Sequence, residues 1–250
     1  MSTYASFQGR VYLGKRDAGG NPQEVRSPGN VAELKLSLKT DVLEHFESQT
    51  GQRSLDHRMV KQKSATVNLT IEEFTKENLA LALYGNHVTG AGGSVTDEPV
   101  GGTVPVIGDR YFLAHPKVDA LVLTDSAGTP ATLTLGTHYT VDTDFGAVQF
   151  LDVSGFTAPF KASYTFGTAT EIGIFTQALP ERFLRLEGIN TAQNNAKVLV
   201  ELYRVAFDPL KEISFISDEY NKFELEGSLL ADTTKPYDAV LGQFGRIVQL

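Results

Sequence analysis

Two pairs of adjacent carboxylates, Glu72-Glu73 and Asp218-Glu219, are the groups in this sequence best suited to general acid–base chemistry. Glycoside hydrolysis needs two carboxyl groups on either side of one bond, roughly 5 to 10 Å apart. Neighbouring residues of a β-strand point to opposite faces of its sheet, so neither pair meets this requirement. We therefore interpret both pairs as solvated strand edges or caps.

Three other patterns approach known catalytic or binding motifs without completing them. No two glycines stand four residues apart, which excludes the Gly-x-Ser-x-Gly elbow of serine hydrolases. The run Gly90-Ala91-Gly92-Gly93 lacks the third glycine of a dinucleotide fingerprint and the Lys-Ser/Thr pair of a phosphate loop, which favours a flexible loop. The segment 142–146 begins like a calcium loop but lacks the final carboxylate, which favours a hairpin turn.

Sulfur and imidazole chemistry have little support in the sequence. The chain has no cysteine, so it has no disulfide, thiolate nucleophile, cysteine-based zinc site or iron–sulfur cluster. No two histidines have the i, i+4 spacing with which one helix face binds a metal ion. The five histidines are His45, His57, His87, His115 and His138. Metal binding by histidine is therefore disfavoured.

The composition is that of an ordinary globular chain. Its 250 residues are 41% hydrophobic and 21% charged, which argues against disorder and allows one large β domain or two smaller ones. The 22 basic and 30 acidic side chains give a net charge of −8, which argues against a surface that neutralises nucleic-acid phosphates. There is no signal peptide and no apolar run of ~18 residues, so we expect synthesis in a cytosol and no membrane span.

The N-terminal part of the chain predicts an arm, two strands and a long loop. Residues 1–30 are rich in Gly, Pro, Ser and charge, which favours an N-terminal arm with one short strand-like piece. Strict alternation of apolar and polar residues over 31–39 and 65–71 predicts two half-buried strands. The polar and charged residues between them, 41–63, predict a loop long enough to have a function.

A helix is expected at Thr75–Tyr84, with Thr75 as its N-cap and Gly85 as a left-handed C-cap. The interior of this helix is apolar nearly all round, which is typical of a helix packed on more than one side. Residues 86–108, dense in Gly, Thr and Val, predict a linker or flexible loop.

The rest of the chain predicts a mainly β fold. Short strands at close spacing, with the clearest hairpin at 139–150, indicate a small β subdomain inserted at 98–170. The core is then expected to combine 31–97 with 171–250. The remaining predicted strands are 183–186, 197–207, 211–216, 222–230 and 246–250.

The order of these segments resembles a known family. The strand Leu34–Lys39, the polar loop through Gln49–Arg53, the strand Ala65–Ile71 and the segment Glu72–Gly85 follow one another as in the major tail tube proteins of long-tailed bacteriophages. The same resemblance extends to Tyr139–Phe150, Arg182–Gly188, Val198–Asp208 and Phe223–Leu230. These motifs are structural, and they cover most of the chain after Val31.

The resemblance implies a β-sandwich or half-barrel with a flanking α-helix, which assembles into stacked hexameric rings around a channel for DNA. It also implies a structural protein with no catalysis and no metal or other cofactor. Such a protein resides in the virion tail after synthesis and assembly in the host bacterial cytoplasm. Its partners are further copies of itself and the tape-measure, tail-tip and tail-terminator proteins, with double-stranded DNA as passing cargo. The inserted subdomain is expected on the tube exterior. A non-contractile tail is the preferred interpretation, and contractile tails and type VI secretion tubes stay open.

Two sets of residues follow from this interpretation. The long loop is expected to contact a neighbouring subunit, since charges of both signs suit an ion-paired surface better than a nucleic-acid groove. Its candidate contact residues are Glu44, Glu47, Arg53, Asp56, Arg58, Lys61 and Lys63. Glu201, Glu224 and Glu226 are expected to face the lumen, where acidic side chains keep DNA from adhering. Lys35 and Lys39, on an alternating polar face, oppose a purely anionic wall.

A glycan-binding β module of a phage or cell-surface structure is the alternative. Tyr111-Phe112 and Tyr203 could stack on sugar rings, with neighbouring acidic residues as hydrogen-bond acceptors. Aromatic residues interleaved in strands more often belong to a core, which favours the tail tube interpretation.

Overall fold

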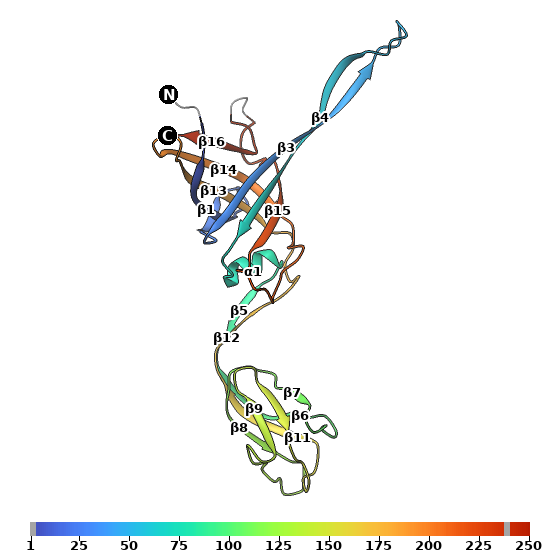
Figure 1. Ribbon diagram of the computed structural model, residues 1–250, viewed down its shortest axis with the longest axis vertical. Helices are drawn as coiled ribbons and strands as arrows, with labels where there is room; N and C mark the ends of the chain where they lie inside the picture. The colour runs from blue at the N-terminus through green and yellow to red at the C-terminus, as the bar shows by residue number, and fades with distance from the viewer. Residues whose placement is uncertain (1–3, 238–240) are drawn as a thin grey trace. The chain divides into compact units, whose positions relative to one another are not determined.

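The computed structural model describes residues 4–237 and 241–250 and confirms a mainly β fold, with 51% strand and 3% helix. The chain forms two compact units (Figure 1). The first unit combines Met1–His87 with Ile172–Leu250, and the second is Val88–Glu171.

The first unit is built on one large antiparallel sheet. Its strands are β1 (Phe7–Arg16), β2 (Pro22–Arg26), β3 (Val31–Phe46), β4 (Leu55–Ile71), β13 (Glu181–Asn190), β14 (Ala196–Phe207), β15 (Phe223–Leu229) and β16 (Gly245–Gln249). Their order is β2-β1-β13-β14-β15-β4-β3, and β16 pairs with β14 beside this path. In the described part of the chain, β2 and β3 therefore form the two ends of the sheet.

One face of this sheet is apolar because apolar and polar residues alternate along its strands. In β4, Val67, Leu69 and Ile71 are fully buried, and Leu225 of β15 lies directly opposite Leu69. The helix α1 (Lys76–Ala82) covers part of this face and contributes Leu81 to the core.

The helix begins as predicted and ends differently. The Thr75 side chain accepts a hydrogen bond from the Asn78 backbone N–H, which confirms the N-cap. The left-handed residue is Tyr84, with φ of 51°, and not Gly85. The Tyr84 hydroxyl donates to the Phe207 carbonyl at 2.5 Å, which holds this conformation. Gly85 is needed for another reason, because a Cβ there would lie 1.9 Å from the Gly173 carbonyl oxygen.

The expectation of an N-terminal arm at 1–30 is wrong for most of its length. β1 pairs with β13 over eight residues, and Val11 and Leu13 lie in the core. The Gly, Pro and Ser residues that suggested an arm belong mainly to the turns on either side of β2. The prediction of an arm used the composition averaged over residues 1–30, which gave little weight to the local alternation at Val11 and Leu13.

The second unit contains two small sheets and its own core. Its strands are β6 (Gly93–Val100), β7 (Arg110–Phe112), β8 (Val118–Thr124), β9 (Tyr139–Asp142), β10 (Ala147–Phe150) and β11 (Phe160–Phe166). The orders are β7-β10-β9 and β6-β11-β8. Phe150 and Phe160 are fully buried at the centre of this core. The predicted hairpin at 139–150 is confirmed.

The segment 86–108 is not the predicted loop. The second unit begins within it, at Val88. The segment contains β5 (His87–Gly90) and β6, and β5 pairs with β12 (Ala169–Ile172) where the chain enters and leaves the unit. Glycine weakens a strand without forbidding it, and β6 keeps hydrogen-bond partners from β11 along its length. The predicted strand at 211–216 is not formed either.

Excision of the second unit is expected to leave the first unit folded. A variant in which Asn-Gly replaces residues 91–168 would join β5 to β12 as a two-residue hairpin. Each unit has its own core, so we expect cooperative urea unfolding with a slope reduced in proportion to the surface removed. Residues 91–168 expressed alone are the matched control, and they should also unfold cooperatively. Loss of cooperative unfolding in the excised variant would contradict two separable units.

Candidate assembly interface

The segment 41–63 is a β-hairpin and not the predicted loop. β3 and β4 stay paired from Val31↔Ile71 to Phe46↔Leu55, and residues 47–54 form the turn. Their pairing shifts register between Asp41 and Val42, opposite Lys61. The many charged side chains of this segment suggested a loop, but they stand on an extended ribbon that is exposed on both faces.

Most of this hairpin lies beyond the rest of its sheet. β15 pairs with β4 only over Thr66–Ile71, and all ten residues of β4 from Leu55 to Ser64 are exposed. Figure 1 shows β3 and β4 continuing past the other strands of the sheet as a two-stranded ribbon. We call residues 37–64 the distal hairpin. A two-stranded hairpin in water is at most marginally stable by itself, so this segment needs a further contact.

Apolar side chains face each other across the distal hairpin. The directly opposed pairs are Val42–Val60, Leu43–Met59 and Phe46–Leu55. Leu43, Phe46 and Met59 each keep about half of their surface exposed. Large apolar side chains gathered on one exposed segment mark a site of protein contact. Sequence reasoning missed these opposed apolar pairs, although their residues occur within 42–60, inside the segment that was predicted to be a polar loop.

The predicted contact residues divide into two groups, of which the first is paired within the hairpin. Arg58 lies 3.6 Å from Glu44, and His45 lies 2.6 Å from Asp56 and lowers its pKa. The Glu47 carboxylate closes the turn by accepting hydrogen bonds from the Thr50 hydroxyl and from backbone N–H groups, which lowers its pKa to about 2.

The second group is basic and has no such partner. Among residues 4–237 and 241–250, no acidic side chain pairs with Arg53, Lys61 or Lys63. Arg53 lies in the turn with φ of 51°, and the two lysines lie on the exposed part of β4. The distal hairpin therefore presents exposed apolar side chains together with three basic side chains that have no ion pair in the described chain, and its net charge is +1.

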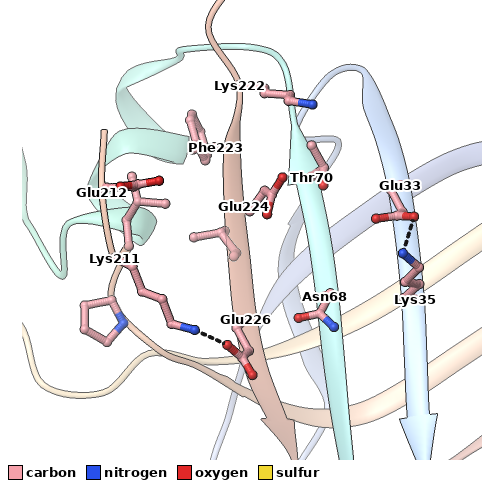
Figure 2. Close-up of a pocket in the computed structure, with 13 residues that line it drawn as sticks. Glu33, Lys35, Asn68, Thr70, Lys211, Glu212, Lys222, Phe223, Glu224 and Glu226 are labelled. Carbon is pink, nitrogen blue, oxygen red and sulfur yellow. Dashed lines mark hydrogen bonds and ion pairs between the residues drawn. The ribbon is translucent and has the colours of Figure 1, made fainter. Parts of the chain in front are cut away.

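A second candidate surface is the polar face of the sheet beside the hairpin base. Glu226, Asn68 and Lys35 form one row across β15, β4 and β3, and Glu224 lies opposite Thr70 in the next row. Figure 2 shows these side chains around a cavity of about 530 Å³. Three lysines line this cavity. Lys35 is paired with Glu33 at 2.7 Å and Lys211 with Glu226 at 2.5 Å, whereas Lys222 has no ion pair among the described residues.

Glu201 does not join the other two glutamates as a free surface charge. It is 7% exposed and lies between the guanidinium groups of Arg185 at 3.0 Å and Arg246 at 2.6 Å. The hydrogen bond to Glu201 raises the pKa of Arg246. The predicted lumen-facing role is therefore corrected for Glu201, because its charge is neutralised inside the sheet. For Glu224 and Glu226 that role stays a prediction.

The predicted sugar-stacking aromatics are divided between the two units, with Tyr111 and Phe112 in the second and Tyr203 in the first. The Tyr111 ring packs edge-on against Phe150 with centroids 5.7 Å apart, and its hydroxyl accepts a hydrogen bond from the Val106 N–H. Tyr203 is half-buried and lies under the Lys235 ammonium group, 5.9 Å from its ring centroid. Phe112 remains exposed by itself.

The comparisons place most of the chain in one family. A family model described as "Protein of unknown function UCP028589" matches residues 4–248. The chain belongs to this family. A comparison with curated proteins finds no match.

Among the described residues, no three His, Asp or Glu side chains gather closely enough to hold a metal ion. No helix in the described ranges is long and apolar enough to cross a membrane. The distal hairpin is exposed and extends beyond the sheet, and the fold of the subunit does not require it.

Proposed function

We propose that this protein is a tail tube subunit of a long-tailed bacteriophage, which forms stacked hexameric rings around a channel for DNA. The observation that carries the proposal is the distal hairpin. A ribbon of this length with opposed apolar pairs on exposed strands gains its stability from a neighbouring copy. The stacked rings and the tube in this proposal are inferred from the family resemblance of the segments around the hairpin.

The ends of the sheet support the same proposal. β2 and β3 are the end strands in the described chain, and β3 is 16 residues long. An open strand of this length invites pairing with another chain. In a closed ring each subunit uses one surface to contact the next and a different surface to contact the previous one, so no such surface stays uncovered.

In the proposed tube, Glu224 and Glu226 belong to the wall that faces DNA. Carboxylates there do not neutralise the phosphates of a passing duplex. No counterions are then released, so the duplex gains no affinity for the wall. Glu33 and Glu226 compensate the neighbouring lysines Lys35 and Lys211, which keeps these cations from binding phosphate. The second unit lies on the exterior, and the partners are the tape-measure, tail-tip and tail-terminator proteins. The proposed tail is non-contractile.

Negative-stain electron microscopy with size-exclusion chromatography across a concentration series tests this function. We expect rings or hollow tubes whose proportion rises with protein concentration. A monomer at every concentration, which also fails to add to sheared tail fragments of a siphovirus used as nuclei, would contradict the proposal. A glycan array serves as the parallel test of the alternative, and specific sugar binding without assembly would favour a glycan-binding module.

A further inference from the structure

A second exposed apolar segment lies on the connection between β14 and β15. Ile216 is 95% exposed and Phe215 is 78% exposed, and Tyr220 is exposed completely. We call residues 212–221 the acidic connector, because they contain three carboxylates and no basic residue. The connector forms no strand, so its apolar side chains have neither a core nor a sheet to cover them.

The charges of the acidic connector complement those of the distal hairpin. In the described part of the chain, no ion pair involves the three carboxylates Glu212, Asp218 and Glu219. The distal hairpin has three unpaired cations, which are Arg53, Lys61 and Lys63. Both segments thus present exposed apolar side chains. The distal hairpin carries five basic and four acidic side chains, a net charge of +1, and the acidic connector carries −3, so their net charges are opposite. Such complementarity favours and orients association.

These two segments cannot meet within one chain. Phe223, directly after the connector, pairs with Ile71 at one end of β4, whereas the hairpin closes at Leu55, sixteen positions away on that strand. An extended strand rises about 3.3 Å per residue, so roughly 25 Å separates this end from Lys63 and roughly 50 Å separates it from the hairpin turn. The connector also lines one cavity with Glu72, the residue after β4, which fixes it at this end. The occupant of each segment must therefore be another molecule.

We propose that the distal hairpin of one copy docks on the acidic connector of the next copy. The two surfaces differ and lie at opposite ends of β4, so each subunit can engage two neighbours, and the contact repeats until a ring closes or a stack forms. This inference rests on the proposed self-assembly, and it adds which segment receives the hairpin.

Charge reversal tests the pairing with full-length protein. One variant carries Arg53→Glu, Lys61→Glu and Lys63→Glu, and the other carries Glu212→Lys, Asp218→Lys and Glu219→Lys. In each variant alone, hairpin and connector have the same sign, and we expect the concentration needed for assembly to rise about 100-fold. In an equimolar mixture every hairpin meets a connector of opposite sign, so assembly should return to near the wild-type concentration. Each variant alone is the control for the mixture.

Cysteine cross-linking gives a readout that does not depend on complete rings. The chain has no cysteine, so Gln52→Cys on the hairpin and Ser217→Cys on the connector introduce single reactive thiols. Mixing these two variants with a short bismaleimide should yield a cross-linked dimer. Mixing Gln52→Cys with Thr140→Cys, an exposed position in the second unit, should yield none.

The outcomes separate this inference from the proposed function. Wild-type rings together with reversal variants that assemble normally would overturn the docking and leave the tube function standing. Cross-linking of Gln52→Cys to itself in place of Ser217→Cys would also overturn it. A wild-type protein that does not assemble, together with cysteine variants that do not cross-link, would overturn both. Recovery of assembly only in the mixture would establish the contact.

Discussion

Replacing Phe46 and Leu55 together by serine is expected to prevent assembly while leaving the subunit folded. The two side chains lie opposite each other near the hairpin turn and are about half exposed. Complete burial of such a side chain contributes about 1.5–3 kcal/mol, so losing two at one interface should raise the concentration needed for assembly by about 100-fold or more. Sedimentation velocity across a concentration series measures this shift.

The stability of the isolated subunit should change much less in that variant. A cross-strand pair contributes about 0.2–1 kcal/mol, so urea unfolding of the monomer should move by no more than that. Val122 and Leu135 in the second unit have similar exposure, and their replacement by serine is the matched control that should assemble normally. Equal loss of assembly in the control, or normal assembly of the hairpin variant, would exclude the distal hairpin as the interface.

Strands with one apolar and one polar face were predictable from the sequence. Val67, Leu69 and Ile71 are buried together because their alternation with polar residues puts them on one face, and the same pattern predicted the hairpin at 139–150. The distal hairpin was not predictable in this way. Both of its faces are exposed, so no buried face imposes an alternation, and its charged residues resemble those of a loop.

The ion-pair partners of the charged candidate residues could not be predicted from the sequence either. Glu201 is neutralised by Arg185 and Arg246 because β13 and β16 place these residues directly opposite it on either side of β14. This depends on register between segments far apart in the chain, which local pattern does not determine. The exposed state of Glu224 was predictable because it alternates with Phe223 and Leu225 on a single strand.

Replacing Asp232 by alanine is expected to destabilise the first unit by about 1.5–3 kcal/mol, the contribution of a hydrogen bond to a charged group, because Arg16 keeps Glu181 at 3.4 Å as a second partner. Asp232 is 1% exposed and lies 2.9 Å from the guanidinium group of Arg16 in β1. It also accepts hydrogen bonds from the Thr234 hydroxyl and N–H. Asp232 therefore connects the segment before β16 to the end of β1. Urea unfolding measures the loss.

The matched control is the exposed ion pair between β1 and β2, at the residue before Arg16. Lys15 and Glu24 lie 2.6 Å apart with both side chains more than half exposed, so Glu24→Ala should cost less than about 1 kcal/mol. Replacing Arg16 by methionine together with Asp232 by leucine should recover much of the loss, because no charge is then left buried without a partner. A cost for Asp232→Ala no larger than that for Glu24→Ala would show that the pair does not hold this segment.

The same ion pair predicts how stability depends on pH. Burial raises the pKa of Asp232, but hydrogen bonds from Thr234 and the charge of Arg16 outweigh it, so the pKa lies below its usual value. A carboxyl group whose pKa is lowered by folding binds fewer protons in the folded state than in the unfolded state. Its stabilisation is therefore complete above about pH 4, the unfolded pKa, and is lost as the pH falls through the folded pKa. The difference in unfolding free energy between wild type and Asp232→Asn should accordingly be constant from neutral pH to about pH 5 and shrink below pH 4.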